Sequence, residues 1–330
     1  MRVVAAPDAF RGTASARAVA AAVGRAAWES GWDCDEVPLA DGGEGTLEAF
    51  GGANRTTRVT GPLGDAVEAH WRLDGRTAVI EMARASGIEV VGGPEANDPI
   101  AASTYGTGEL VAAAVDAGAR RIVVGVGGSA TTDGGLGALR ALHPTTRLKG
   151  VELLVACDVR TGFVAAADTF APQKGATPAQ VELLRRRLGR LAQVYLEDHG
   201  VDVTALPGAG AAGGLAGGLA AVGARLVDGF ELVADEVGLW EHVEGADLVV
   251  TGEGFLDAQS FEGKVVGGVA DLALAAGVAV VAVAGAIYDG VESRIEAVSL
   301  VERFGEERAM VATETCIEEV VRELLSSRAS

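Results

Sequence analysis

Residues 122–137 read Ile-Val-Val-Gly-Val-Gly-Gly-Ser-Ala-Thr-Thr-Asp-Gly-Gly-Leu-Gly. The stretch opens as a short apolar run of β-branched residues, which is typical of a strand buried on both faces. It then breaks into glycines mixed with Ser129, Thr131, Thr132 and Asp133. Glycines let backbone N–H groups approach an anion, and hydroxyls followed by a carboxylate suit a phosphate with its Mg²⁺. A tight turn capped by Ser129 or Thr132 and leading into a helix explains the stretch equally well.

Three strand-like runs elsewhere are also followed by loops with charged residues. They are residues 2–6, 36–40 and 246–250, which lead to Asp8 and Arg11, to Asp41 and Glu44, and to Glu253 and Asp257. In doubly wound sheets, ligands bind beyond the carboxyl ends of the strands. We therefore expect the first two loops to share one site. For any single Asp-Gly loop, a plain turn is the simpler interpretation.

The composition limits the class of protein. At 330 residues the chain is long for a single hydrophobic core, which favours two domains. A hydrophobic share of 49%, with only 5% aromatic residues and 47 glycines, favours an α/β protein with many short turns. A formal net charge of −19 argues against nucleic acid or an anionic membrane as a partner. Local basic residues and backbone amides must then hold any anionic substrate.

The cysteines and the apolar runs bear on the location of the protein. Cys34, Cys157 and Cys316 lie far apart without metal-ligand spacing, which predicts reduced thiols in a cytoplasm. The apolar residues at the N-terminus are too few for a signal peptide. The uncharged run 272–288 is near the lower limit for a membrane span. Gly277 divides that run into a helix end and a strand, so we expect it to be buried core.

Two common nucleotide motifs are absent or out of context. Gly263-Lys264 is followed by Val265 and not by Ser or Thr, so it is no P-loop. Residues 208–213 match the dinucleotide fingerprint G-x-G-x-x-G, with Asp228 at the distance of a ribose-binding acid. They follow a polar segment in place of a convincing strand, which weakens this alternative of a nicotinamide-dependent oxidoreductase. The histidines lie outside the glycine motifs and receive no catalytic role: His70, His143, His199 and His242.

Nine short motifs follow one another in order along nearly the whole chain. They are Ala-Pro-Asp-Ala-Phe-Arg-Gly (6–12), Pro-Leu-Ala-Asp-Gly-Gly-Glu-Gly-Thr (38–46), Gly-Pro-Leu-Gly (61–64), Ile-Glu-Met-Ala-Arg-Ala-Ser-Gly (80–87), Thr-Tyr-Gly-Thr-Gly-Glu-Leu (104–110), Gly-Gly-Ser-Ala-Thr-Thr-Asp-Gly-Gly (127–135), Pro-Gln-Lys-Gly-Ala (172–176), Pro-Gly-Ala-Gly-Ala-Ala-Gly-Gly (207–214) and Thr-Gly-Glu-Gly-Phe-Leu-Asp-Ala-Gln-Ser (251–260). In this order they resemble the type I (bacterial) glycerate kinase family. Each motif alone would be weak, and their collinearity makes the resemblance specific.

The resemblance implies ATP-dependent, Mg²⁺-assisted phosphorylation of D-glycerate, usually to the 2-phosphate. Such a reaction asks the protein to position two reactants and to neutralise the charge of the transferring group. Glycine loops supply amides, and the scarce lysines supply compact point charges. We expect these roles: catalytic for Asp41, Lys174 and Asp257; substrate-binding for Asp8, Arg11, Glu44 and Lys264; nucleotide-binding for Gly127, Gly128, Ser129, Thr131, Gly210 and Gly213; and metal-binding for Asp133 and Glu253. Within this set, Asp41 is the expected base and Arg11 the expected clamp on the glycerate carboxylate.

The expected architecture is two α/β domains. Residues 1–58 and 245–330 are expected to form a Rossmann- or flavodoxin-like domain, and residues 59–244 an inserted α/β domain, with the site in the cleft between them. Breaks in composition near residues 60–62 and 244–245 suggest these boundaries. A homodimer is left open.

The chain departs from the family pattern in three places. Arg11 stands where many members have lysine, and the loop after Asp158 lacks the usual Asn-Pro-Leu. The segments 143–150 and 160–165 look short, and we expect residues of a mobile loop to be missing from the numbering there. The altered loop is the only support for a second alternative, a non-catalytic small-molecule sensor. The choice between the 2- and 3-hydroxyl, or another short hydroxy acid, is also open.

Overall fold

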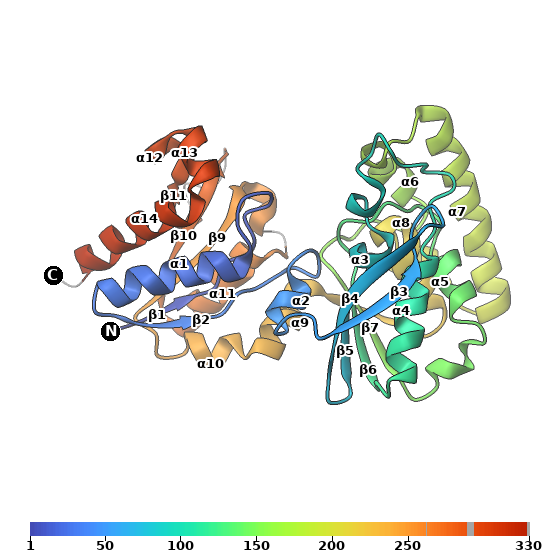
Figure 1. Cartoon of the computed structure of the whole chain (residues 1–330), viewed down its shortest axis with the longest axis horizontal. Helices are drawn as coiled ribbons and strands as arrows, with labels where there is room; N and C mark the ends of the chain where they lie inside the picture. Colours follow the sequence, from blue (N-terminus) through green and yellow to red (C-terminus); the bar gives the residue numbers. More distant parts are fainter. Residues whose placement is uncertain (262, 289–293, 329–330) are drawn as a thin grey trace. The chain divides into compact units, whose positions relative to one another are not determined.

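The computed structural model describes residues 1–261, 263–288 and 294–328 (Figure 1). The chain forms two compact units. The first comprises Met1–Asp41, Glu48–Phe50 and Phe230–Ser330, and the second comprises Gly42–Leu47 and Gly51–Gly229. The composition break near residue 60 lies inside the second unit, and the one near residue 244 lies inside the first. The exact domain boundaries stay a prediction. Each unit contains one sheet, so the expected α/β class with two sheets is confirmed.

The first unit is built on a sheet of five strands in the order β11-β10-β9-β1-β2. Their bounds are β1 Arg2–Ala5, β2 Asp33–Glu36, β9 Leu248–Leu256, β10 Ala279–Ile287 and β11 Glu296–Ser299. All neighbouring pairs are parallel. Counted along the chain, this is the order 2-1-3-4-5 of flavodoxin-like doubly wound sheets, in which the strand order reverses between the first and third strands. The expected flavodoxin-like domain is therefore present.

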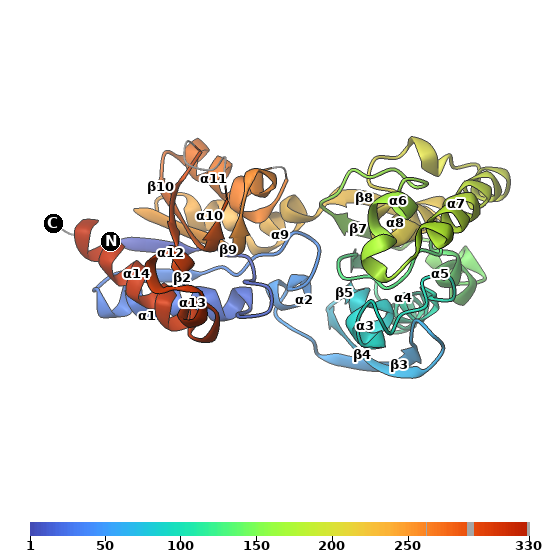
Figure 2. The same cartoon turned by 90° about the horizontal axis from the view of Figure 1, so that it is seen from above.

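Both faces of this sheet are covered by helices (Figures 1 and 2). Because side chains alternate along a strand, Val3 and Ala5 point to one face and Val4 and Ala6 to the other. The first face packs on α1 and α14, and the second on α9, α10 and α11. The helices of this unit are α1 Ala16–Glu29, α9 Gly229–Val237, α10 Leu239–Val243, α11 Val265–Ala276, α12 Leu300–Phe304, α13 Glu306–Val311 and α14 Thr313–Arg328.

The second strand does not lie where the sequence predicted it. The expected strand covered residues 36–40, whereas β2 covers the polar residues Asp33–Glu36. Its register is set by pairing with β1, from Arg2 opposite Asp33 to Ala5 opposite Glu36. An edge strand tolerates charged side chains, because only one of its sides is paired. The apolar residues Val37 and Leu39 follow the strand and are buried.

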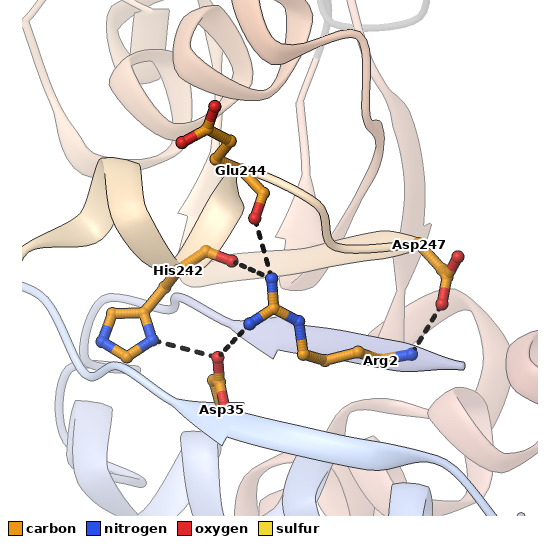
Figure 3. A network of polar contacts seen from close by, with 5 residues as sticks. All are labelled: Arg2, Asp35, His242, Glu244 and Asp247. Atoms are coloured by element: carbon orange, nitrogen blue, oxygen red, sulfur yellow. Dashed lines mark hydrogen bonds and ion pairs between the residues drawn. The ribbon is translucent and has the colours of Figure 1, made fainter.

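A polar network closes the amino ends of these strands (Figure 3). The Arg2 guanidinium lies 3.2 Å from the Asp35 carboxylate and donates to the carbonyls of His242 and Glu244 at 3.1 and 2.9 Å. The imidazole Nδ1 of His242 lies 3.0 Å from the same Asp35 oxygen, and the Arg2 backbone N–H donates to Asp247. The network thereby connects β1, β2 and the end of α10 around Arg2, the first residue of β1.

The second unit contains a mixed sheet in the order β3-β4-β5-β6-β7-β8. The strands are β3 Arg55–Thr60, β4 Ala66–Asp74, β5 Thr77–Glu81, β6 Arg121–Gly125, β7 Glu152–Cys157 and β8 Arg225–Asp228. The first two pairs are antiparallel and the others parallel. The helices are α3 Ala83–Ser86, α4 Tyr105–Asp116, α5 Leu136–Ala141, α6 Ala166–Phe170, α7 Pro178–His199 and α8 Ala211–Ala221, while α2 Thr46–Ala49 is divided between the units.

Several local predictions are confirmed by the structure. A capping box begins α7, as the sequence Thr177-Pro-Ala-Gln180 predicts, with the Thr177 side chain accepting from the Gln180 backbone N–H. The run 272–288 divides at Gly277, the left-handed end of α11, and continues into β10. It is buried core only in part, because Leu274 in α11 is 78% exposed. In the described part of the chain, no helix is long and apolar enough to cross a membrane. The three cysteines are free thiols, and burial raises the pKa of Cys34 to about 12 and that of Cys157 to about 11.

Candidate functional site

Four of the predicted acidic residues lie near one another in the first unit: Asp8, Asp41, Glu253 and Asp257. β1 and β9 are neighbours in the sheet, and the Asp8 backbone N–H donates to the Gly252 carbonyl at 2.9 Å. Asp8 therefore lies beside Glu253, at the point where the strand order reverses. In doubly wound sheets this is the place where ligands bind.

These surroundings raise the pKa of Asp8. Burial is the largest cause of its rise to about 8, and the negative charges of Asp41 and Glu253 raise it further. The Ala9 backbone N–H, 2.7 Å from Asp8 Oδ1, and the ammonium of Lys264 act in the opposite direction. Asp8 therefore keeps its proton at neutral pH.

Glu253 carries a buried oxygen without a partner. Burial is the main cause that raises the pKa of Glu253, and a hydrogen bond to Ser260 and the charge of Lys264 counteract it. Its Oε1 atom has no hydrogen-bond partner in the described part of the chain. An unsatisfied buried acceptor is costly, so this atom is suited to a cation or to a hydroxyl of a ligand.

Asp257 and Arg11 both lie in the first unit, but Asp257 is held by backbone hydrogen bonds whereas Arg11 is exposed. Asp257 Oδ1 accepts from the backbone N–H groups of Gln259 and Ser260 at 2.8 and 3.2 Å, so this carboxylate caps the 3₁₀ turn Ala258–Phe261. Arg11 is exposed on the loop after β1. That loop runs close along Gly254, where an added Cβ would lie 3.4 Å from the Arg11 backbone nitrogen. The catalytic role of Asp257 and the clamping role of Arg11 stay predictions.

The loop after Asp41 belongs to the second unit and is held there by Glu81. The Glu81 carboxylate is buried and accepts from the backbone N–H groups of Gly45 and Leu47 at 3.1 and 2.9 Å. Glycine is required where this loop meets β6, since a Cβ on Gly127 would lie 2.6 Å from the Gly43 Cα atom. Glu44 is exposed on this loop. The structure therefore places Glu44 with the second unit and Asp8, Arg11 and Asp41 with the first.

Lys174 is the most constrained of the predicted residues in the second unit. Its side chain is 3% exposed, and Nζ donates to Ser129 Oγ and to the Thr131 carbonyl, each at 2.6 Å. Burial lowers the pKa of Lys174 to about 7, although the charge of Asp133 raises it slightly. An ammonium has three N–H donors, and these bonds use two of them. The structure thus brings together Lys174, Ser129 and Thr131, and their catalytic and nucleotide-binding roles stay predictions.

Asn97 supports the same loop and was missed by the sequence analysis. Its Nδ2 atom donates to the Ala130 carbonyl at 3.0 Å and to the Lys174 carbonyl at 2.9 Å. The amide therefore ties Lys174 to the glycine-rich loop. Its position in an Asn-Asp-Pro sequence predicts only a turn. No local signal announces partners 33 and 77 residues away.

The Asp133 carboxylate is occupied by donors of the protein itself. It accepts from the backbone N–H groups of Thr104, Gly135 and Gly137 at 2.9, 3.0 and 3.1 Å. The Thr104 hydroxyl also donates to it at 2.9 Å. These bonds fix the start of α5, which is a structural task that the sequence analysis did not foresee. The metal-binding roles of Asp133 and Glu253 stay predictions.

The predicted nucleotide-binding glycines are packed against other backbone segments. A Cβ on Gly213 would collide with the Thr131 carbonyl, and one on Gly210 with the Gly162 carbonyl. The segment before them contains the 3₁₀ helix Val203–Ala205 and no strand. A dinucleotide fingerprint requires a preceding strand, so the context of the oxidoreductase alternative is missing. Gly128 has a φ of +71°, which favours glycine on conformational grounds alone.

The two short loops are continuous in the full sequence of 330 residues. Residues 143–150 form a brief connection around the 3₁₀ helix Thr145–Leu148, and residues 160–165 lead directly into α6. The expectation that residues are missing from the numbering is therefore wrong. Both loops are short in this chain.

Comparison with known proteins gives the family. The model of the glycerate kinase family matches residues 3–145 and 143–328. The chain belongs to the glycerate kinase family. The match is interrupted at the short loop after α5, and this agrees with the shortness noted above. The sequence-based recognition of the family is confirmed, and the kinase class with it.

Individual relatives agree with this result. The chain is 41% identical over 331 residues to glycerate 2-kinase of Escherichia coli strain K12, covering 88% of this chain and 87% of the relative. It is 38% identical to a glycerate kinase of Halalkalibacterium halodurans, covering 98% and 97% of the two chains. The crystal structure of a Salmonella typhimurium LT2 protein designated as a glycerate kinase 2 is similar with a TM-score of 0.85. That structure is 36% identical and covers all of this chain, with 98% of its own length matched.

Proposed function

We propose that this chain transfers the γ-phosphoryl group of ATP to the 2-hydroxyl of D-glycerate, with Mg²⁺ assisting. The observation that carries the proposal is the group of carboxylates at the strand ends of the first unit. There, burial and neighbouring charges raise the pKa of Asp8 to about 8 beside Asp41 and Glu253. Perturbed carboxylates at a ligand-binding edge are typical of acid–base chemistry.

The acceptor side of the reaction is assigned to the first unit. The raised pKa of Asp8 favours its protonated form, and we assign to the neighbouring Asp41 the role of taking the proton of the substrate hydroxyl. The hydroxyl oxygen then forms its bond to the γ-phosphorus while the bond from that phosphorus to the bridging oxygen of ADP breaks. Arg11 binds the substrate carboxylate, and Lys264 offsets the surrounding negative charge.

The phosphate side is assigned to the glycine-rich loop of the second unit. Lys174 offers its third N–H, and the Ser129 hydroxyl and the backbone amides at Gly127 and Gly128 are further donors. With a pKa of about 7, Lys174 is charged in part at neutral pH, and a bound phosphate would favour its charged form. Such donors neutralise charge that develops on the transferring group.

The residues also fit a magnesium ion. Mg²⁺ in kinases is held by one or two carboxylates with phosphate oxygens and water. Glu253 offers the buried oxygen without a partner and is our candidate ligand. In the described part of the chain there is no group of three His, Cys, Asp or Glu side chains that could hold a metal alone. When bound, the ion would offset the charge of the β- and γ-phosphates.

A coupled assay of ADP release tests the proposal. Purified protein is supplied with ATP and Mg²⁺ and with one of D-glycerate, L-glycerate, glycolate or lactate. Release of ADP that depends on D-glycerate supports the proposal. Binding of glycerate without turnover favours the sensor alternative. Reduction of NAD(P)⁺ with a hydroxy acid, without ADP release, would contradict the kinase assignment.

A further inference from the structure

A cavity of about 620 Å³ lies in the second unit, away from the residues assigned to phosphate binding. Its walls come from the loop 100–105, the start of α5 and one face of α7. Thr132 and Asp133 of the glycine-rich loop complete the wall. Lys174, Ser129 and the predicted nucleotide-binding glycines do not line it. The cavity is therefore a separate feature of this unit.

Three arginines line this cavity in a chain with a net charge of −19. Arg187 donates to the Ile100 carbonyl at 3.1 Å, and Arg190 to the Gln193 amide oxygen at 2.9 Å. Both acceptors are uncharged, so these hydrogen bonds hold the guanidinium groups without neutralising their positive charge. Arg190 also lies 3.9 Å from Glu197, an exposed pair that contributes little. Arg140 has no ion pair in the described part of the chain.

The carboxylate in the wall offsets part of this charge, but its oxygens are held by donors of the protein. Asp133 Oδ1 and Oδ2 are engaged by backbone N–H groups and by the Thr104 hydroxyl. Three arginine side chains, each exposed to solvent, therefore border the cavity. Guanidinium groups bind phosphate oxygens through paired hydrogen bonds, which makes a phosphate the favoured anion.

The remaining wall is partly apolar, with Ser103 and Tyr105 also in it, and one buried hydroxyl of the wall has no partner in the described residues. Leu136, Leu188, Leu191 and Val194 provide the apolar surface. The Thr132 side chain is 2% exposed, and its hydroxyl has no hydrogen-bond partner in the described part of the chain. A volume of about 620 Å³ is within the range for drug-sized ligands and is larger than a glycerate-sized molecule needs. The lining thus suits a phosphate attached to a flat apolar body.

We propose that this cavity binds a nucleoside phosphate as an effector, outside the reaction centre. The three arginines hold the phosphate, and the leucine-rich wall contacts the base. The cavity is linked to Lys174 through one loop, because Thr132 and Asp133 directly follow the Thr131 carbonyl that Lys174 binds. A ligand that orders this loop would change the position of Lys174. The effect on rate and the total number of ADP molecules bound rest on the proposed function, whereas the loss of one ADP site in the cavity variants does not.

Calorimetric titration of the full chain tests the binding. We expect two ADP molecules to bind per chain in the wild type and one in the double variant Arg140→Glu, Arg190→Glu. The affinity of the lost site should fall by about tenfold or more, because charge-assisted bonds are removed. Arg186→Glu, an exposed arginine of α7 outside the cavity, is the matched control and should keep both sites.

Additional variants and ligands test whether the site exists and whether it recognises the nucleoside. Val194→Trp should fill the cavity without changing its charge and should also abolish the second site. If both cavity variants bind ADP as the wild type does, the site does not exist. If inorganic phosphate alone binds there as tightly as ADP, the nucleoside part of the proposal is wrong. AMP should change the rate of glycerate-dependent ADP release in the wild type and not in the cavity variants; an equal response in all of them would contradict the effector role.

Discussion

At the scale of single residues, Asp8 is held in its protonated form by its surroundings. Its pKa of about 8 lies above the ordinary value of 3.8, mainly because of burial. Between about pH 4 and pH 8 the folded chain thus keeps a proton that the unfolded chain has lost, so this carboxyl lowers stability as the pH rises through that window. Asp8→Asn should therefore unfold at a higher temperature than the wild type at pH 8, and the difference should shrink towards pH 4.

Thermal unfolding across this pH range measures the effect. Asp33→Asn, which changes an exposed carboxylate of the same unit, is the control and should follow the wild type. A constant difference between Asp8→Asn and the wild type at every pH would show that Asp8 has no raised pKa.

Asp41 is expected to act on the substrate hydroxyl. Changing Asp41 to Asn keeps the shape of the side chain but removes the base, which should lower kcat by roughly 10²–10⁴. The KM for ATP should change little, because Asp41 is assigned to the acceptor side. Steady-state kinetics with each substrate varied in turn separate these effects. A normal kcat with a raised KM for ATP would place Asp41 on the nucleotide side.

Lys174 and Lys149 form a matched pair for testing the buried ammonium. Lys174→Met should lower kcat/KM strongly, because a phosphate loses its nearest point charge. It should also destabilise the fold by about 1–3 kcal/mol, since Ser129 Oγ and the Thr131 carbonyl lose their donor. Lys149 is exposed, so Lys149→Met should change neither the kinetics nor the unfolding temperature. Lys264→Met should reduce activity with folding nearly intact; unchanged kinetics in Lys174→Met and Lys264→Met would remove both lysines from the site.

At the scale of elements, the glycine-rich loop before α5 is anchored by the Asp133 carboxylate. Changing Asp133 to Asn turns one acceptor into a donor that faces N–H groups of Gly135 or Gly137. We expect a loss of about 2 kcal/mol in the free energy of unfolding, and excess Mg²⁺ should not restore it. Chemical denaturation with and without Mg²⁺ measures this loss. Normal stability, with a rate that added Mg²⁺ restores, would instead establish Asp133 as a metal ligand.

Some elements could be predicted from the sequence and others could not. The strands that end in acidic loops could be predicted from the sequence, because each is an apolar run followed within a few residues by a carboxylate, such as Asp8 or Glu253. The polar strand β2 could not, since its place is fixed by pairing with β1. Glu81, Asn97 and Thr104 were missed for a similar reason: their partners lie 29 to 77 residues away, and no spacing along the chain signals them.

At the scale of the whole molecule, the order of motifs carried more information than any one motif. Gly208, Gly210 and Gly213 match a dinucleotide fingerprint, but in the structure they allow close backbone packing. Conversely, Arg187 is exposed on α7 and also lines a cavity, which no pattern in the sequence indicates. Both cases arise because a glycine or an arginine serves packing and binding equally well, and only the fold decides between them.

The most direct test of the account is the ³¹P NMR spectrum of a reaction with ATP, Mg²⁺ and D-glycerate. Transfer to the 2-hydroxyl places phosphorus next to a carbon with one hydrogen, so the product resonance should be a doublet that grows as the γ-phosphate signal of ATP disappears. A triplet would show that the 3-hydroxyl is the acceptor and would contradict the proposed product. A spectrum in which only inorganic phosphate appears, or in which ATP stays intact, would contradict the kinase assignment itself.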